Sequence, residues 1–198
     1  MATLLESTGH HVTTLDLIGS GINMSRVRQV NGSLVDYIKP LIDFMASLPP
    51  TAAKVVLVGH SLGGLSIFLA MERFPNKISA AVFVTALMPG PNLSFLTISK
   101  EDFVLALSLV RAFPLFNDKE LVLKQAKLTK ERYGSVRRVF IVCDQDYAIE
   151  EGLQRSMIER NPPHEVKVIN GTDHMAMFTR PLKLFSYLGE IANKYSYK

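Results

Sequence analysis

The sequence has one cysteine, no tryptophan and no hydrophobic run long enough to cross a membrane. A single cysteine cannot close an internal disulfide, which excludes a disulfide-stabilised scaffold and suits a reducing compartment. The longest apolar run, residues 78–89, is much shorter than the ~20 residues of a membrane-spanning helix. Residues 1–7 lack the basic and apolar segments of a signal peptide. We therefore expect a cytoplasmic protein without a membrane partner.

The chain also lacks a strong excess of charge of one sign. Its 22 basic and 18 acidic residues are interleaved and give a net charge of +4. Because no basic arm or aromatic stacking platform is present, we do not expect a nucleic-acid partner. No group of His, Cys, Asp and Glu has metal-ligand spacing and no glycine-rich loop suggests a phosphate site, so we expect no cofactor. A hydrophobic fraction of 47% in 198 residues predicts a single folded domain over residues 1–198.

Segments typical of strands alternate with helical patterns along the chain. Apolar and β-branched runs predict strands at 11–16, 54–58, 80–85, 136–143 and 165–169. Helical spacing of apolar residues predicts helices at 33–48, 62–73, 149–160 and 181–194. Ser33 is expected to cap the first of these helices and Pro40 to kink it. The alternation indicates an α/β fold with a mostly parallel sheet flanked by helices.

Residues 89–128 interrupt this alternation. The segment is rich in proline and contains two further helical patterns, at 99–111 and 118–128. An insertion at the strand ends of an α/β sheet lies where ligands bind. We therefore expect a lid over the sheet, without a core of its own.

The strongest chemical motif is Gly59-His60-Ser61-Leu62-Gly63, which matches the nucleophile-elbow pattern G-x-S-x-G. A strand is predicted directly before it and a helix directly after it, as the pattern requires. We expect glycines on both sides because a serine on this strained turn leaves no room for neighbouring Cβ atoms. The amide of Leu62, at the start of the helix, can face a developing oxyanion. The His60 side chain is expected to point away from the elbow.

A serine nucleophile needs a base that is oriented by an acid, and in this fold both follow later strands. His174 follows the predicted strand 165–169, and Asp144 and Asp146 both follow the strand 136–143. Spacing does not decide between these two aspartates. Asp173 is adjacent to His174 and is expected to be a turn or cap residue. The other histidines, His10, His11 and His164, are expected to be structural or solvated.

Several longer motifs carry a resemblance to a known family. VGHSLGG, AMERFPNKI, AAVFV, RYGSVRR and GTDHMAM together resemble the plant methylesterase and hydroxynitrile lyase family of α/β-hydrolases. The resemblance runs from residue 4 to residue 195 and implies the α/β-hydrolase fold. Similar esterases hydrolyse methyl salicylate, methyl jasmonate, methyl indole-acetate or an alkaloid methyl ester. The resemblance therefore implies a serine carboxylesterase that hydrolyses small methyl esters through an acyl-enzyme, without a cofactor.

The resemblance also implies a role for each site residue. Ser61 corresponds to the nucleophile, Asp146 to the acid and His174 to the base, and the Leu62 amide to one oxyanion donor. The lyases of the family carry a lysine directly after the histidine. Here Met175 stands at that position and is expected to contact the substrate, so the resemblance favours an esterase over a lyase.

The sequence departs from the family pattern in two places. Family members begin with an additional strand, a His-Gly loop that supplies a second oxyanion amide, and a helix, which are absent here. The lid at 89–128 is also shorter than in the family. Losing one oxyanion donor costs roughly 10²–10³ in turnover. A weakened relative that binds a hormone-like carboxylate is therefore the alternative function, a hydroxynitrile lyase is a less favoured one, and a homodimer is a further expectation.

Overall fold

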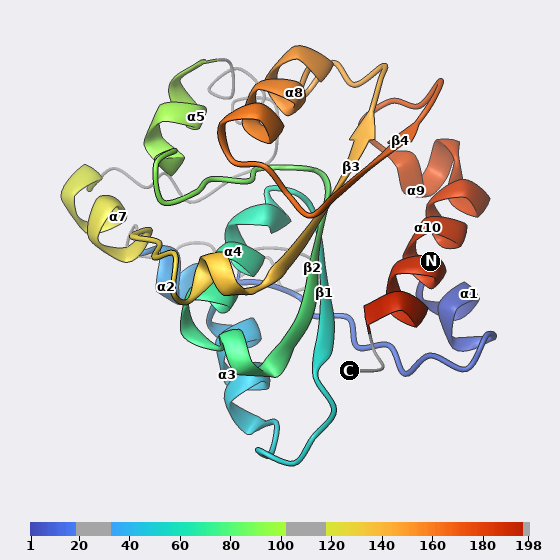
Figure 1. Cartoon of the computed structure of the whole chain (residues 1–198), viewed down its shortest axis with the longest axis horizontal. Helices are drawn as coiled ribbons and strands as arrows, with labels where there is room; N and C mark the ends of the chain where they lie inside the picture. The colour runs from blue at the N-terminus through green and yellow to red at the C-terminus, as the bar shows by residue number, and fades with distance from the viewer. Residues whose placement is uncertain (19–32, 102–117, 196–198) are drawn as a thin grey trace.

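The computed structural model describes residues 1–18, 33–101 and 118–195, and of residues 99–101 only the backbone. Within these residues the centre of the protein is a parallel sheet in which strands that are consecutive in sequence are also neighbours in space (Figure 1). Its order is β1 (Val55–Ser61), β2 (Ile78–Ala86), β3 (Arg137–Cys143) and β4 (Glu165–Ile169). The predicted α/β class with a parallel sheet is confirmed.

Helices cover both faces of the sheet (Figure 1). One apolar core lies between the sheet and the helices α2 (Leu34–Tyr37), α3 (Lys39–Ser47), α4 (Gly63–Arg73), α5 (Phe95–Glu101), α7 (Lys119–Gln125) and α8 (Glu151–Arg160). A second core lies on the other face, against α1 (Ala2–Glu6), α9 (Ala176–Thr179) and α10 (Pro181–Tyr195). Two 3₁₀ turns, η2 (Pro75–Lys77) and η3 (Tyr133–Ser135), precede β2 and β3. All nine residues of β2 are buried, as its continuous apolar sequence predicts.

The predicted helix 33–48 is two helices. Ser33 caps α2, because its side chain accepts a hydrogen bond from the Asp36 amide. The helical geometry then breaks at Ile38, with φ −92° and ψ 7°, and α3 begins with Pro40 in its first turn. Proline is well tolerated there, since the first amides of a helix have no intrahelical acceptor. The expected kink is therefore a boundary between two helices.

The predicted strand at 11–16 is wrong. These residues have no regular secondary structure, and among the described residues β1 forms an edge of the sheet. A strand forms only where a neighbour pairs with its backbone, and no described strand pairs with 11–16. On the same edge the side chain of Val58 is 46% exposed, although Val58 belongs to an apolar run.

The first helix of the lid begins earlier than predicted. Helix α5 starts at Phe95, and most of the predicted helix 99–111 lies outside the described residues. The second predicted lid helix, 118–128, is confirmed as α7, and Asp118 caps it by accepting a hydrogen bond from the Leu121 amide. Phe95 and Ile98 of α5 are buried in the core that contains α4, so the described start of the lid packs onto the domain.

None of the helices among residues 1–18, 33–101 and 118–195 is long and apolar enough to be a membrane span.

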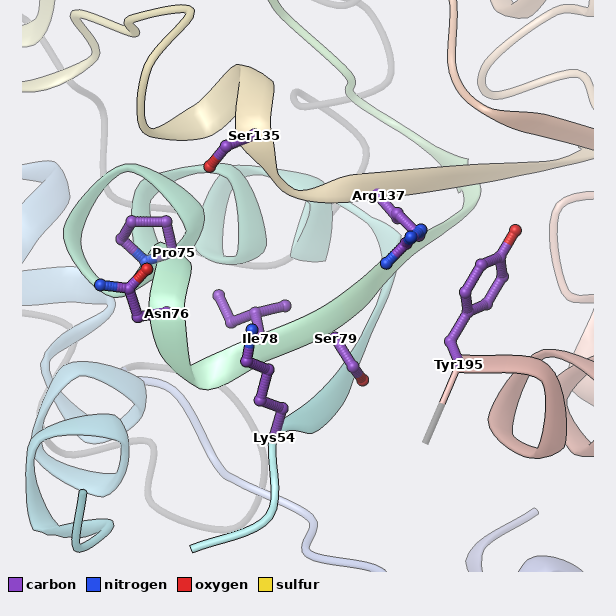
Figure 2. A pocket seen from close by; sticks show the side chains of 8 residues that line it. All are labelled: Lys54, Pro75, Asn76, Ile78, Ser79, Ser135, Arg137 and Tyr195. Atoms are coloured by element: carbon purple, nitrogen blue, oxygen red, sulfur yellow. The ribbon is translucent and has the colours of Figure 1, made fainter. Parts of the chain in front are cut away.

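A polar hollow of about 210 Å³ lies at the amino ends of β1, β2 and β3 (Figure 2). Lys54 and Arg137 line it together with Ser79, and Tyr195 of α10 borders it. This hollow is at the opposite end of the strands from Ser61. The cytoplasmic location and the homodimer stay predictions.

Candidate active site

The four strands end at the same edge of the sheet, and each brings one polar side chain there. Ser61 is the last residue of β1, and Thr85 is the last but one of β2. Asp146 follows β3 and His174 follows β4, each in the loop beyond its strand. In an open parallel sheet this carboxyl edge is where ligands bind. The candidate site is therefore assembled from four separate segments of the chain.

Ser61 lies on a strained turn. Its φ is 54°, which is rare for a residue other than glycine, and α4 begins two residues later. A Cβ atom on Gly59 would lie 2.6 Å from the Gly63 carbonyl oxygen, and one on Gly64 would lie 2.1 Å from that of Leu87. A Cβ atom on Gly63 would meet nothing within 4 Å. The expectation that close packing requires both glycines of the pattern is thus correct for Gly59 and wrong for Gly63.

Asp146 and His174 are brought into direct contact. His174 Nδ1 lies 2.7 Å from Asp146 Oδ2, and the Asp146 side chain is fully buried. The other oxygen, Oδ1, accepts hydrogen bonds from the amides of Ala148 (2.7 Å) and Ile149 (2.9 Å). The hydroxyl of Thr85 also donates to Oδ2. This carboxylate is therefore held on both oxygens.

The electrostatic state of Asp146 follows from these contacts. Burial by itself raises the pKa of a carboxyl group, because it disfavours the charged form. Here the hydrogen bonds from His174, Thr85 and the Ile149 amide outweigh burial and lower the pKa of Asp146 below its usual value. The group is consequently ionised at neutral pH and can stabilise a positive charge on His174.

The two other aspartates of these loops have structural roles. Asp144 Oδ1 accepts hydrogen bonds from the amides of Gly171 (2.7 Å) and Thr172 (3.3 Å). Asp173 Oδ1 accepts one from the Met175 amide (2.9 Å), as expected of a turn residue. Of Asp144 and Asp146, between which spacing does not decide, the structure places Asp146 against His174 and Asp144 against the loop amides.

The expectation that His60 points away from the elbow is wrong. Its Nε2 lies 2.7 Å from the backbone carbonyl oxygen of His174, and the two imidazole rings are 4.6 Å apart between centroids. A carbonyl only accepts, so His60 carries a proton on Nε2. Burial, aided by the charge of His174, lowers the pKa of His60 despite the opposing effects of this hydrogen bond and of Asp146. A neutral His60 thus braces the loop that carries His174.

Ser61 and His174 both lie at the carboxyl ends of the strands, but no hydrogen bond joins them in the part of the chain that the structure describes. Catalytic hydrogen bonds are often long without substrate and tighten when it binds. Leu62 is the N-cap of α4, so its amide is free of the intrahelical bonding pattern and lies beside Ser61. Met175 is 40% exposed directly after His174.

Large apolar side chains are exposed in the segments that follow Asp146 and His174. Tyr147, next to Asp146, is 89% exposed, and Phe178 in α9 is 75% exposed. Among the described residues no group of three His, Cys, Asp or Glu side chains is placed to hold a metal ion. Burial, together with the charges of neighbouring aspartates, raises the pKa of the Cys143 thiol to about 12, so it is not a thiolate nucleophile. The arrangement favours serine chemistry on an apolar substrate.

Sequence reasoning missed two contributors to the site, Thr85 and the inward-facing His60. Thr85 is the only polar residue in the second half of an otherwise apolar strand, which is a weak signal by itself. The position of His60 follows from the side-chain alternation of β1, but only once the adjacent loop is placed.

Three comparisons relate the chain to known proteins. The family model described as the alpha/beta hydrolase fold matches residues 1–108. Methyl jasmonate esterase 1 of Vitis vinifera is 43% identical over 99% of this chain and 91% of its own length. Salicylic acid-binding protein 2 of Nicotiana tabacum is 40% identical over 98% and 90% of the two chains. A crystal structure of tomato methylketone synthase I, the H243A variant with beta-ketoheptanoate, has a TM-score of 0.86 at 38% identity and covers 98% and 90%.

The alignment with the Vitis vinifera esterase has an informative length. It spans 241 positions, although this chain has only 198 residues, so the esterase has residues inside the matched region that this chain lacks. A shortened lid requires an internal deletion of this kind.

Proposed function

This chain belongs to the plant methylesterase family of α/β-hydrolases, and we propose that it hydrolyses methyl esters of small carboxylic acids with Ser61 as nucleophile. The observation that carries the proposal is the 2.7 Å contact between His174 Nδ1 and the buried carboxylate of Asp146, at the end of the sheet where Ser61 occupies a strained turn. Serine, acid and base follow one another in the chain order of this fold.

In the first half of the reaction, Ser61 Oγ attacks the ester carbonyl while His174 Nε2 takes the hydroxyl proton. The Leu62 amide donates to the oxyanion of the tetrahedral intermediate. Collapse of this intermediate breaks the bond to the methoxy group, which leaves as methanol with the proton from His174. The product is an acyl-Ser61 ester.

In the second half, His174 takes a proton from water as the water oxygen attacks the acyl carbonyl. The bond between the acyl carbon and Ser61 Oγ then breaks, the acid leaves, and His174 returns the proton to Oγ. Asp146 holds Nδ1 of the imidazole protonated, so Nε2 is the basic nitrogen in both halves. It also stabilises the imidazolium that forms transiently, because it is ionised and buried next to it.

The substrate class rests on the relatives and on the exposed apolar side chains that follow Asp146 and His174 in the chain. The relative from Vitis vinifera is named for methyl jasmonate and the one from Nicotiana tabacum for salicylic acid. Apolar side chains at Met175, Tyr147 and Phe178 suit the hydrophobic part of such an ester. We therefore propose methyl jasmonate and methyl salicylate as the first esters to assay.

The test compares the wild-type chain with Ser61→Ala. The wild type is expected to release methanol from one of the two esters and to be labelled by a fluorophosphonate probe at Ser61. Ser61→Ala should lose both. Equal turnover in Ser61→Ala would contradict the proposal, and binding of salicylate or jasmonate by a wild type that the probe does not label would favour the binding-protein alternative.

The lyase alternative has its own assay. A lyase would release cyanide from a cyanohydrin, whereas the proposed esterase is expected to release none, since Met175 offers no cation to the leaving cyanide. Cyanide release at the rate of ester hydrolysis would overturn the esterase assignment.

A further inference from the structure

Strand β2 contains one extra residue at its active-site end. His60 of β1 pairs with Val84 of β2, but the next residue, Ser61, pairs with Ala86, so Thr85 has no partner in β1. The φ of Thr85 is 35°, in the left-handed region that β-branched residues seldom adopt. Thr85 is therefore a β-bulge residue, and bulges next to active sites serve to re-aim a side chain.

The bulge directs the side chain of Thr85 toward Asp146. Thr85 is fully buried, and its hydroxyl contacts Asp146 Oδ2, the same oxygen that receives His174 Nδ1. An ionised carboxylate has no proton to give, so the hydroxyl is the donor. We propose that Thr85 is a positioning residue for catalysis, which fixes the Asp146 carboxylate in the orientation that holds His174.

The other contacts of Asp146 show why this donor matters. Oδ1 is held by the amides of Ala148 and Ile149, two and three residues further along the same loop. Oδ2 has Thr85 as its only described donor besides His174. His174 lies in a loop beyond β4, whereas Thr85 belongs to a strand in the centre of the sheet. Thr85 thus links the orientation of Oδ2 to the sheet.

The backbone strain supports the same inference. A left-handed conformation in a β-branched residue is unfavourable and persists only where the surroundings enforce it. Apolar packing alone gives no reason for a hydroxyl at this fully buried position, because a valine has nearly the same shape. The hydroxyl and the strained bulge together are explained by the hydrogen bond to Asp146.

The kinetic part of the test rests on the proposed esterase function. Thr85→Val keeps the β-branched shape and the backbone strain but removes the donor. Its kcat is expected to fall about tenfold, which corresponds to the lower end of the range for loss of a hydrogen bond to a charged group. KM should stay close to the wild-type value, since Thr85 is inaccessible to substrate. Thr85→Ser, which keeps the hydroxyl, should retain most of the turnover.

A second readout does not depend on any substrate. Carbon-13 NMR of the side-chain carboxyl carbons follows the titration of Asp146 in each variant. The hydroxyl stabilises the ionised form more than the neutral form, so Thr85→Val should raise the pKa of Asp146 and Thr85→Ser should restore it. This measurement distinguishes a failure of the positioning role from a failure of the esterase proposal.

Thr85→Gly is a second variant without the hydroxyl, for the case that Thr85→Val does not fold. Glycine adopts the positive φ of this position without strain. If Thr85→Val does not fold, Thr85→Gly is expected to show the same raised Asp146 pKa and lowered kcat. The inference is overturned if, in a folded variant without the hydroxyl, the pKa of Asp146 equals the wild-type value. It is also overturned if kcat of that variant equals kcat of Thr85→Ser.

Discussion

His60 Nε2 donates a hydrogen bond of 2.7 Å to the backbone carbonyl of His174, so the residue before the nucleophile supports the loop of the base. The two imidazole rings also lie 4.6 Å apart. A second positive charge so close to His174 is unfavourable while His174 becomes an imidazolium. The neutrality of His60, which burial maintains, is thus compatible with the proposed reaction.

The His60 hydrogen bond predicts a difference between two substitutions. His60→Gln keeps a side-chain donor and should retain more activity than His60→Ala, which leaves the His174 carbonyl unpaired. We expect kcat of His60→Ala to be lower by roughly tenfold, the effect of about 1.4 kcal/mol. Steady-state hydrolysis by both variants measures this, and equal rates would mean that His60 only fills space.

The lowered pKa of His60 also predicts how stability changes with pH. The unfolded chain protonates His60 near 6.5, while the folded protein resists protonation, so the unfolded state binds more protons as the pH falls below 6.5. Stability should therefore decrease from pH 7 to pH 5.5. In urea unfolding, the free energy of unfolding of His60→Gln should decrease less over this pH range than that of the wild type. The matched control is His11→Gln at an exposed position, whose free energy of unfolding should change with pH as in the wild type.

The pairing of Asp146 with His174 predicts unequal effects for the two neighbouring aspartates. Asp146→Asn should lower kcat by roughly 10³–10⁴, because an amide neither stabilises an imidazolium nor selects the correct tautomer. Asp144→Asn keeps an oxygen that can accept from the Gly171 amide and should lose far less. Comparing kcat of the two variants separates them, and a larger loss in Asp144→Asn would reverse the assignment of the acid.

The elbow glycines predict contrasting stabilities. In Gly64→Ala the new Cβ would lie 2.1 Å from the Leu87 carbonyl oxygen, so backbone must move, at a cost of about 3 kcal/mol or more. In Gly63→Ala the Cβ meets nothing within 4 Å, and alanine is the better helix former at the start of α4. Its free energy of unfolding should be unchanged or slightly higher. Urea unfolding of both variants tests the packing of α4 against the loop after β2.

Hydrogen exchange should differ between strands. The amides of 139–142 lie in an interior strand with neighbours on both sides and should exchange slowly. Those of 11–16 have no ladder and should exchange fast, while β1, at the edge, should be intermediate. Exchange followed by mass spectrometry would reveal a different architecture if 11–16 were as protected as 139–142.

The sequence predicts the interior of this fold well, because the physical signals there are local. An apolar run such as 80–85 is buried on both faces in any arrangement of the sheet, and the elbow around Ser61 needs only its own strand and helix. The segment 11–16 has the same β-branched composition, yet a strand also requires a partner, which composition does not supply.

The details of the site depend on contacts between distant residues, which spacing does not encode. Thr85 and Asp146 are 61 positions apart, and a one-residue bulge decides whether they meet. Likewise Asp144 and Asp146 are equivalent in spacing, and only the folded loops show which of them contacts His174. The family resemblance selected Asp146, the aspartate that contacts His174 in the structure, because it compares whole loops.

The site depends on all four strands, because each of the four residues lies at the carboxyl end of a different strand or in the loop that follows it. Assembly of the site therefore reports on folding of the whole sheet. Ser61, Thr85, Asp146 and His174 converge only when β1 to β4 are all in register. Loss of any one strand separates the serine from its base or the base from its acid. The fraction of a preparation that an activity-directed probe labels would then count molecules with a complete sheet, whereas circular dichroism also counts molecules with helices alone.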